Sequence, residues 1–149
     1  MKDDWQQCRL SDVATVNELS GGPNAGTIKY IDISSVTMGQ YPKPTIVSSE
    51  EAPSRARRIL RDGDTVLSTV RPERKSYFYA KNVEPNTICS TGFAVISPKK
   101  IESRFLYYTL TNDNYIEFLS RNARGAAYPA VSFDTIADSY IQYPPLPIQ

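Results

Sequence analysis

Apolar and polar residues alternate in short runs over the first hundred positions of the chain. Four such segments, 27–36, 44–49, 64–70 and 87–98, are rich in β-branched and aromatic residues, and a fifth follows at 139–144. This pattern is typical of short β-strands. Proline and glycine residues separate the segments and indicate turns between them. The sequence therefore predicts five or six short strands.

From residue 101 onward, the apolar positions follow a helical period instead. The residues that fall largely on one helical face are Phe105, Leu106, Tyr108, Leu110, Tyr115, Ile116 and Leu119. This face predicts helices packed on the sheet, with the Tyr107 and Tyr108 pair in the core rather than at a base-stacking surface. The fold class predicted is α+β, with a twisted, mostly antiparallel β-sheet core and helices mainly in the C-terminal third.

Residues that favour helix N-termini precede each of the predicted helices. They are Ser103 for the first helix, Asn112 or Asp113 for the second, and Ser132 or Asp134 for a short third turn. The run "TNDN" at 111–114 separates the first two helices, and the second is expected to end within 122–125. These residues therefore predict three separate helices in the C-terminal part of the chain.

Length and composition predict a single domain over residues 1–149, because 40% hydrophobic content is enough for one buried core. The first ten residues contain no apolar signal core, and no stretch approaches the length of a membrane span. We therefore expect a cytoplasmic protein with no membrane partner. Cys8 and Cys89 are too few for a disulfide framework and are expected to be reduced and structural.

The chain contains no histidine, which excludes a Ser-His-Asp triad and removes the commonest general base and zinc ligand. It also has neither the G-x-x-x-x-G-K-[ST] phosphate loop nor a G-x-G-x-x-G segment after a strand. The "QYPPL" run at 142–146 lacks the Asn or Asp that an amino-methylating motif needs before its prolines. No cofactor is predicted for this chain.

Charge is distributed unevenly, although the net charge is only +1. Residues 55–75 carry seven basic and three acidic groups, a net charge of +4, and the other ten basic and thirteen acidic groups leave the rest at −3. Such a chain can present a basic face to a phosphate backbone. A solvated loop is the alternative interpretation of this segment.

The stretch "GDTVLSTVRPERKSYFYA" at 63–80 leads from a strand directly into basic and then aromatic residues. Because Pro72 cannot donate to a ladder, it is expected to end the strand. Arg71, Arg74 and Lys75 then follow the strand end, where they can contact phosphates or, for arginine, guanine edges.

Further candidates for DNA binding lie on both sides of this stretch. "SRARRILR" at 54–61 would position phosphates through Arg55, Arg57 and Arg58, and Tyr77 and Tyr79 alternate with the predicted core residue Phe78. A second region, "RNARGAAYPAVS" at 121–132, supplies Arg121, Arg124, Gly125 and Tyr128. Gly125 is interpreted either as a helix C-cap or as a point of close backbone approach to a phosphate. Tyr77 and Tyr79 are left open between DNA contact and core.

Two other functions remain as alternatives. Asp62 or Asp64 followed by Glu73 and Lys75 resembles the acid and lysine pattern of Mg²⁺-dependent nucleases, although Pro72 adjoins the proposed ligand. The low net charge would also suit a protein-interaction module without DNA affinity. Cleavage assays in Mg²⁺ and duplex binding at low salt distinguish these alternatives.

The order of short motifs along the chain resembles one target-recognition domain of a type I restriction-modification specificity subunit. The matching positions are Trp5, Leu10, Asp12 and Val13, "YIDISSV" at 30–36, "GDTVLSTVRP" at 63–72, "STGFAVISP" at 90–98, "FLYYTL" at 105–110, Gly125 before "VSFDTI", and "YPPLPIQ" at 143–149. The order and spacing of these motifs carry the resemblance, since no one of them is decisive alone.

This resemblance implies a non-catalytic component that reads one half of a bipartite double-stranded DNA target for phage defence. It implies methyltransferase subunits as partners, which methylate adenine, and a restriction subunit that is contacted indirectly. S-adenosylmethionine, ATP and Mg²⁺ would then be bound by those partner subunits. The chain corresponds to half of a typical specificity subunit, without the long conserved helix that follows each such domain in the family.

Overall fold

The computed structural model describes residues 5–21 and 26–145 of the chain. Its strands are β1 (Gln6–Arg9), β2 (Ala14–Val16), β3 (Thr27–Ile31), β4 (Thr45–Ser48), β5 (Ala56–Ile59), β6 (Thr65–Ser68), β7 (Tyr77–Tyr79), β8 (Thr87–Ser90), β9 (Phe93–Pro98) and β10 (Tyr140–Tyr143). Its helices are α1 (Leu10–Val13), α2 (Ser103–Thr111), α3 (Asp113–Arg121) and α4 (Phe133–Asp138), with short 3-10 helices η2 (Ile33–Ser35) and η3 (Pro72–Arg74). The last four residues of the "YPPLPIQ" motif lie outside the described part.

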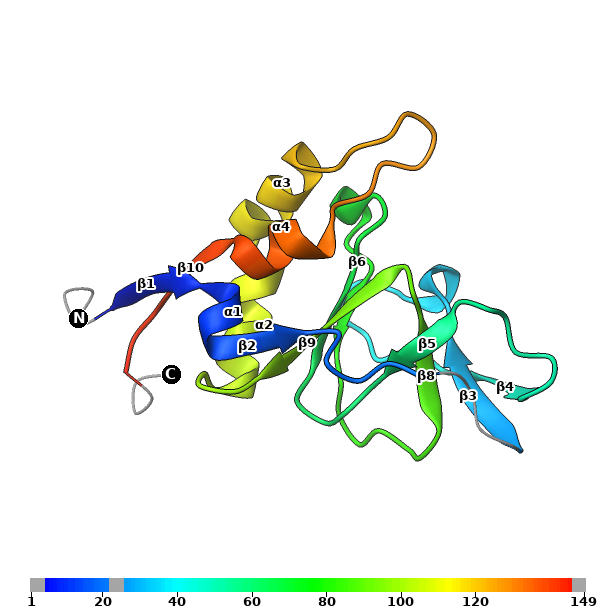
Figure 1. Ribbon diagram of the computed structural model, residues 1–149. Helices are drawn as coiled ribbons and strands as arrows, with labels where there is room; N and C mark the ends of the chain where they lie inside the picture. Colours follow the sequence, from blue (N-terminus) through cyan, green and yellow to red (C-terminus); the bar gives the residue numbers. More distant parts are fainter. Residues whose placement is uncertain (1–4, 22–25, 146–149) are drawn as a thin grey trace.

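The strands form two four-stranded sheets and one two-stranded ribbon (Figure 1). The central sheet has the order β2-β9-β6-β7, the second sheet has the order β4-β3-β8-β5, and β1 pairs with β10. All these pairs are antiparallel except β3 with β8. The predicted α+β fold with a mostly antiparallel core is confirmed.

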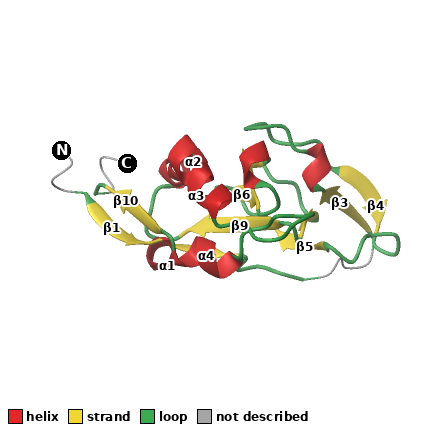
Figure 2. Ribbon diagram, turned by 90° about the horizontal axis from the view of Figure 1, so that it is seen from above, coloured by secondary structure: helices red, strands yellow, loops and turns green. Residues whose placement is uncertain are grey.

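The central sheet is buried on both faces. One face packs against the helices through Leu67, Ala94 and Ile96, and the other faces the second sheet through residues such as Val66 and Phe93. In Figure 2 the β1–β10 ribbon lies at one end of the molecule and β3 and β4 lie at the other, with β9 between them. Because β6 and β9 are buried on both sides, they give firm support to the segments that follow their ends.

The segment 87–98, predicted as one strand, is two strands in different sheets. β8 belongs to the second sheet and β9 to the central sheet, and the chain turns between them at Thr91 and Gly92. A Cβ atom on Gly92 would lie 2.4 Å from Cδ1 of Ile33, so that a larger residue there would require the Ile33 side chain to shift. The turn between the two sheets thus packs closely against Ile33.

Helix capping differs from the prediction at one of the three N-termini. Glu102, not Ser103, caps α2, and its carboxylate accepts hydrogen bonds from the backbone N–H groups of Arg104 and Phe105. Asn112 caps α3 and Ser132 caps α4, as predicted. The Ser103 hydroxyl instead lies 2.8 Å from the Tyr79 hydroxyl and donates to the Glu102 carboxylate at 3.2 Å.

Tyr107 is buried, as predicted, but Tyr108 is 63% exposed, so the prediction of a buried pair was wrong for Tyr108. The buried face of α2 is formed by Leu106, Tyr107 and Leu110, which turns Tyr108 outward. Cys8 and Cys89 are free thiols, and burial raises the pKa of Cys89 strongly. Within the described residues, no helix is both long and apolar enough to cross a membrane.

Candidate nucleic-acid interface

The chain leaves the end of β6 in an unusual backbone conformation. Arg71 and Lys75, which flank η3, both have positive φ angles, of 46° and 58°. Pro72 lies at the first position of η3, where its fixed φ suits the helix and its missing N–H costs nothing. This short helix leaves Arg74 exposed on the surface, three residues beyond the Arg71 turn.

The loop between α3 and α4 forms a second projection, at the upper right of Figure 1. We call residues 124–130 the hairpin loop, because Arg124 and Ala130 exchange two backbone hydrogen bonds of 2.8 and 2.9 Å across its base. Gly125 has a φ of 116°, and a Cβ atom there would lie 3.0 Å from the carbonyl oxygen of Tyr128. Gly125 is thus part of the loop turn, not a C-cap, since Asn122 is the C-cap of α3.

Arg71 connects these two projections. Its backbone N–H donates to the carbonyl of Pro129 at 2.8 Å, and its guanidinium donates to the carbonyl of Ala127, also at 2.8 Å. The guanidinium carbon lies 5.7 Å from the centre of the Tyr128 ring. The backbone of Val131 also donates to Thr69, so the hairpin loop continues the edge of the β6 segment.

Ion pairs remove part of the positive charge at this surface. Lys75 binds Asp113 at 3.1 Å, which joins η3 to α3, and Arg121 binds Glu117 within α3. Arg124 donates to the carbonyl of Arg121 at 3.2 Å. Within the described residues, the side chains of Arg71, Arg74 and Arg124 have no acidic partner in an ion pair. Glu73 in η3 offsets one of these charges, so the three arginines leave the two projections with a net positive charge.

The predicted basic segment at 54–61 contains β5, a strand that the sequence analysis missed. Arg55 lines a cavity of about 600 Å³ together with Val70 and Ala130, so it approaches the hairpin loop. The half-buried Arg58 instead places its guanidinium 5.0 Å from the Phe133 ring centre, and burial lowers its pKa. Arg57 is exposed and donates to the carbonyl of Ser54.

Tyr77 and Tyr79 lie on the face of β7 that packs against α2. Both rings make edge contacts with Tyr107, and the Tyr79 hydroxyl lies 2.8 Å from the Ser103 hydroxyl. Arg104 covers the Tyr79 ring at 4.3 Å. The structure thus joins these two tyrosines to the helical layer and does not bring them to the hairpin loop.

The four residues of the nuclease pattern are not brought together. Asp64 precedes β6 and is buried, where it accepts the backbone N–H of Arg61 at 2.8 Å, and burial raises the pKa of its carboxyl group. Asp62 accepts the backbone N–H of Val83. Glu73 lies in η3, beyond the other end of β6. Among the residues that the structure describes, no group of three or more acidic, cysteine or histidine side chains could hold a metal ion.

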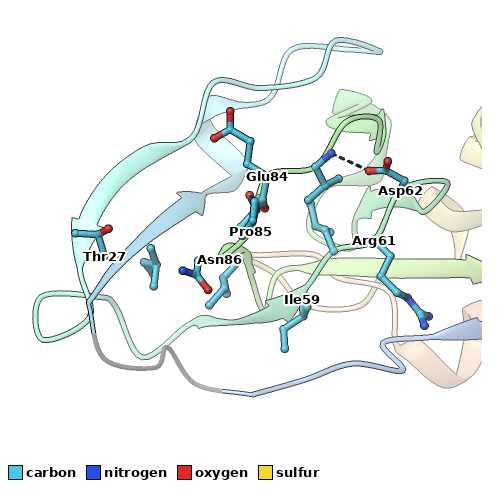
Figure 3. A pocket seen from close by; sticks show the side chains of 12 residues that line it. Thr27, Ile59, Arg61, Asp62, Glu84, Pro85 and Asn86 are labelled. Carbon is cyan, nitrogen blue, oxygen red and sulfur yellow. Dashed lines mark hydrogen bonds between the residues drawn. The ribbon is translucent and has the colours of Figure 1, made fainter.

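A cavity of about 410 Å³ lies elsewhere, between β3, β8 and the segment after β5 (Figure 3). The charged groups on its wall have partners within the protein: Arg61 binds Glu18, Glu84 binds Lys29, and Asp62 accepts from Val83. The cavity therefore does not carry unpaired arginines like those at η3 and the hairpin loop.

Comparison with known proteins gives one family. The model of the type I restriction modification DNA specificity domain matches residues 2–149. The HindI type I restriction enzyme specificity subunit of Haemophilus influenzae is 24% identical over 146 residues, which cover 95% of this chain and 32% of that protein. The chain thus spans about a third of the length of this curated relative.

Two solved structures have the same fold over nearly the whole chain. The HsdS subunit from Thermoanaerobacter tengcongensis is 29% identical with a TM-score of 0.81, and the match covers 97% of this chain and 39% of that one. A chain from a structure on complex assembly and conformational transition of the type I R-M system is 30% identical with a TM-score of 0.84, covering 96% and 38%.

Proposed function

Because the chain belongs to the family of type I restriction-modification DNA specificity domains, we propose that it reads one half of a bipartite double-stranded DNA target. In this proposal the chain has no catalytic chemistry of its own and acts in the cytoplasm. It directs adenine methylation, and indirectly restriction, by partner subunits that bind S-adenosylmethionine, ATP and Mg²⁺.

One observation supports this function most directly: η3 and the hairpin loop form a single exposed surface, held together by Arg71. The surface carries Arg74 and Arg124 without acidic partners, and Tyr128 at the end of the loop is 75% exposed. Cationic groups beside a projecting loop suit a duplex, because the cations contact phosphates while the loop enters a groove. The buried strand β6 gives this surface a rigid base.

The candidate residues divide into roles on this basis. We assign Arg74 and Arg124 to direct DNA contact and Arg55 and Arg57 to phosphates beside it. Lys75 and Arg121 face the DNA only in part, because each is held by an acidic neighbour. Gly125 shapes the loop. We assign no DNA contact to Arg58, Tyr77 or Tyr79, which pack against aromatic rings of the protein.

The first test is selection from a pool of random duplexes by the purified chain at low salt, followed by sequencing of the bound fraction. Enrichment of one short sequence is the expected result. Co-expression with methyltransferase subunits of a type I restriction-modification system should then place adenine methylation at sites that contain this sequence.

Other outcomes contradict the proposal in distinct ways. Retention of all duplexes equally would leave a non-specific DNA-binding protein, and no retention at low salt would favour a protein-interaction module. Cleavage of the duplexes in Mg²⁺ or Mn²⁺ would return the nuclease interpretation, in spite of the separation of Asp64 from Glu73.

A further inference from the structure

The side chain of Arg71 contacts the hairpin loop that carries Tyr128, a contact that the proposed DNA-reading function does not by itself require. Arg71 is only half exposed, and its guanidinium is engaged twice: with the carbonyl of Ala127 at 2.8 Å and over the ring of Tyr128 at 5.7 Å. Its backbone N–H also holds Pro129. All three contacts go to the hairpin loop, so the side chain is directed inward to the loop and not out to a duplex.

The end of the hairpin loop offers one side chain able to recognise a base. Residues 125–128 are all exposed, and the first three, Gly125, Ala126 and Ala127, carry no polar or aromatic group. Tyr128 combines a flat ring with a hydroxyl that can both donate and accept a hydrogen bond. The small neighbours let this ring approach closely to a groove.

Cation–π attraction and the Ala127 hydrogen bond together restrict the positions that Tyr128 can adopt before binding. A side chain ordered in advance loses less entropy when it meets its partner. The two closing hydrogen bonds between Arg124 and Ala130 restrain the base of the same loop. Removal of Arg71 would therefore free the end of the loop without removing any atom that touches DNA.

Resting on the proposed function, we propose that Tyr128 contacts a base of the target and that Arg71 is the positioning residue for Tyr128. Arg71 then acts through the hairpin loop and reads no base itself. Arg74, three residues further along the chain, differs because its side chain makes no hydrogen bond or ion pair with the described residues. It is the matched arginine that acts directly.

A double-mutant cycle on the selected target duplex tests this assignment. Tyr128→Ala and Arg71→Ala should each weaken binding about tenfold. The combined variant should bind DNA about as well as the single variant with the lower affinity, because both changes remove the same interaction. Arg74→Ala combined with Tyr128→Ala should instead show the product of the two losses. Thermal unfolding of each variant checks that the fold is kept.

Salt dependence separates positioning from phosphate contact. Arg71→Ala should leave the slope of log affinity against log salt unchanged, whereas Arg74→Ala should reduce it. The proposal is overturned if the losses of DNA affinity caused by Arg71→Ala and Tyr128→Ala multiply in the combined variant. It is also overturned if Arg71→Ala relaxes preference at one base position that Tyr128→Ala leaves intact, since Arg71 would then read a base.

NMR relaxation tests the positioning role without DNA. Arg71→Ala should increase the backbone mobility of Ala127 and Tyr128, while Val95 in the central sheet stays rigid. Unchanged mobility at Ala127 and Tyr128 would overturn the inference even if the DNA proposal holds. Conversely, greater loop mobility with no DNA binding by the wild type would show a positioned loop but remove the proposed function.

Discussion

Arg71 and Lys75 adopt backbone conformations that would suit glycine better. The contacts of their side chains explain why these residues stand there. A non-glycine residue in the left-handed region costs roughly 1–2 kcal/mol, and both positions have it, with φ angles of 46° and 58°. Each side chain makes a contact that glycine could not make: Arg71 to the Ala127 carbonyl and Lys75 to Asp113. Strain at the end of β6 is thus coupled to the elements around η3.

Gly125→Ala should disturb the hairpin loop selectively. The new Cβ atom would lie 3.0 Å from the carbonyl oxygen of Tyr128 at a φ of 116°, and such a conformation costs about 1–3 kcal/mol. We expect DNA affinity to fall about tenfold. Gly39→Ala is the matched control, because Gly39 also has a positive φ, of 75°, but borders Tyr107 instead. Equal affinity losses in both variants would contradict the prediction.

Asp64→Asn should make the free energy of unfolding less dependent on pH. Burial raises the pKa of Asp64 in the folded chain above its ordinary value of about 4. The folded state therefore prefers the protonated carboxyl, so its contribution to stability is complete at low pH and is lost as pH rises through the folded-state pKa. The asparagine side chain cannot ionise, yet it keeps an oxygen that accepts the Arg61 N–H.

Urea unfolding of both proteins from pH 3 to pH 7 measures this effect. The advantage of the asparagine variant over the wild type should grow as pH increases. If the free energy of unfolding of the wild type instead rises relative to that of the variant over this range, the folded state favours the carboxylate form of Asp64. The direction assigned to its pKa shift would then be wrong.

The sequence predicted candidate residues at this surface but could not predict how Arg71 is used. Pro72 gave a clear signal because its ring fixes φ, and Gly125 indicated a turn because glycine accepts a positive φ, although the sequence left open whether that turn was a helix C-cap. The partner of Arg71 is a main-chain oxygen of Ala127, 56 residues away, in a run of small residues. A carbonyl in such a run has no signature in the sequence, since every residue has one. Whether a given arginine faces DNA or protein was therefore beyond the sequence.

At the scale of elements, Asn112→Ala should destabilise α3. The Asn112 side chain accepts the backbone N–H of Tyr115 at 2.8 Å and donates to Thr109, so it connects the end of α2 to the start of α3. Loss of such a cap costs about 1 kcal/mol of unfolding free energy. Asn114→Ala, two residues later in the same helix, removes an exposed amide without this role.

Denaturant midpoints of the two variants give the comparison. A decrease for Asn112→Ala with little change for Asn114→Ala is expected. Equal midpoints for both would mean that α3 is held by its buried face through Ile116 and Leu119 and not by its cap.

Element prediction worked where a pattern was local and failed where distant packing decided. The β-prone run at 64–70 and the caps Asn112 and Ser132 depend on neighbours within a few residues. The division of 87–98 into β8 and β9 is set by pairing with distant strands, since β8 pairs with β3 and β5 whereas β9 pairs with β2 and β6. β5 was missed because its basic residues indicate a solvated segment, although they pair with β8 over 56–59.

At the scale of the whole molecule, DNA affinity should depend strongly on salt despite the net charge of +1. Each phosphate contact that is lost lowers the slope of log affinity against log salt by about 0.9. Arg74→Ala and Arg124→Ala should each lower it by about that amount. Lys81→Ala removes an equal charge beyond the opposite end of the β6–β7 hairpin and should leave the slope unchanged.

Fluorescence anisotropy at several salt concentrations measures these slopes. If Lys81→Ala lowers the slope as much as Arg74→Ala does, binding reflects the total charge of the protein and not the surface at η3. That result would also remove the basis for assigning Arg74 and Arg124 to direct contact.

The pairing of β1 with β10 has a consequence for the gene as well as for the fold. Gln6 lies opposite Tyr143, so that the chain enters and leaves this unit at neighbouring points in space. Under the proposed function, recombination between related genes at the codons for these two positions would exchange the unit at two neighbouring junctions. The same proposal expects such a cassette exchange to change the half-target that a restriction system reads.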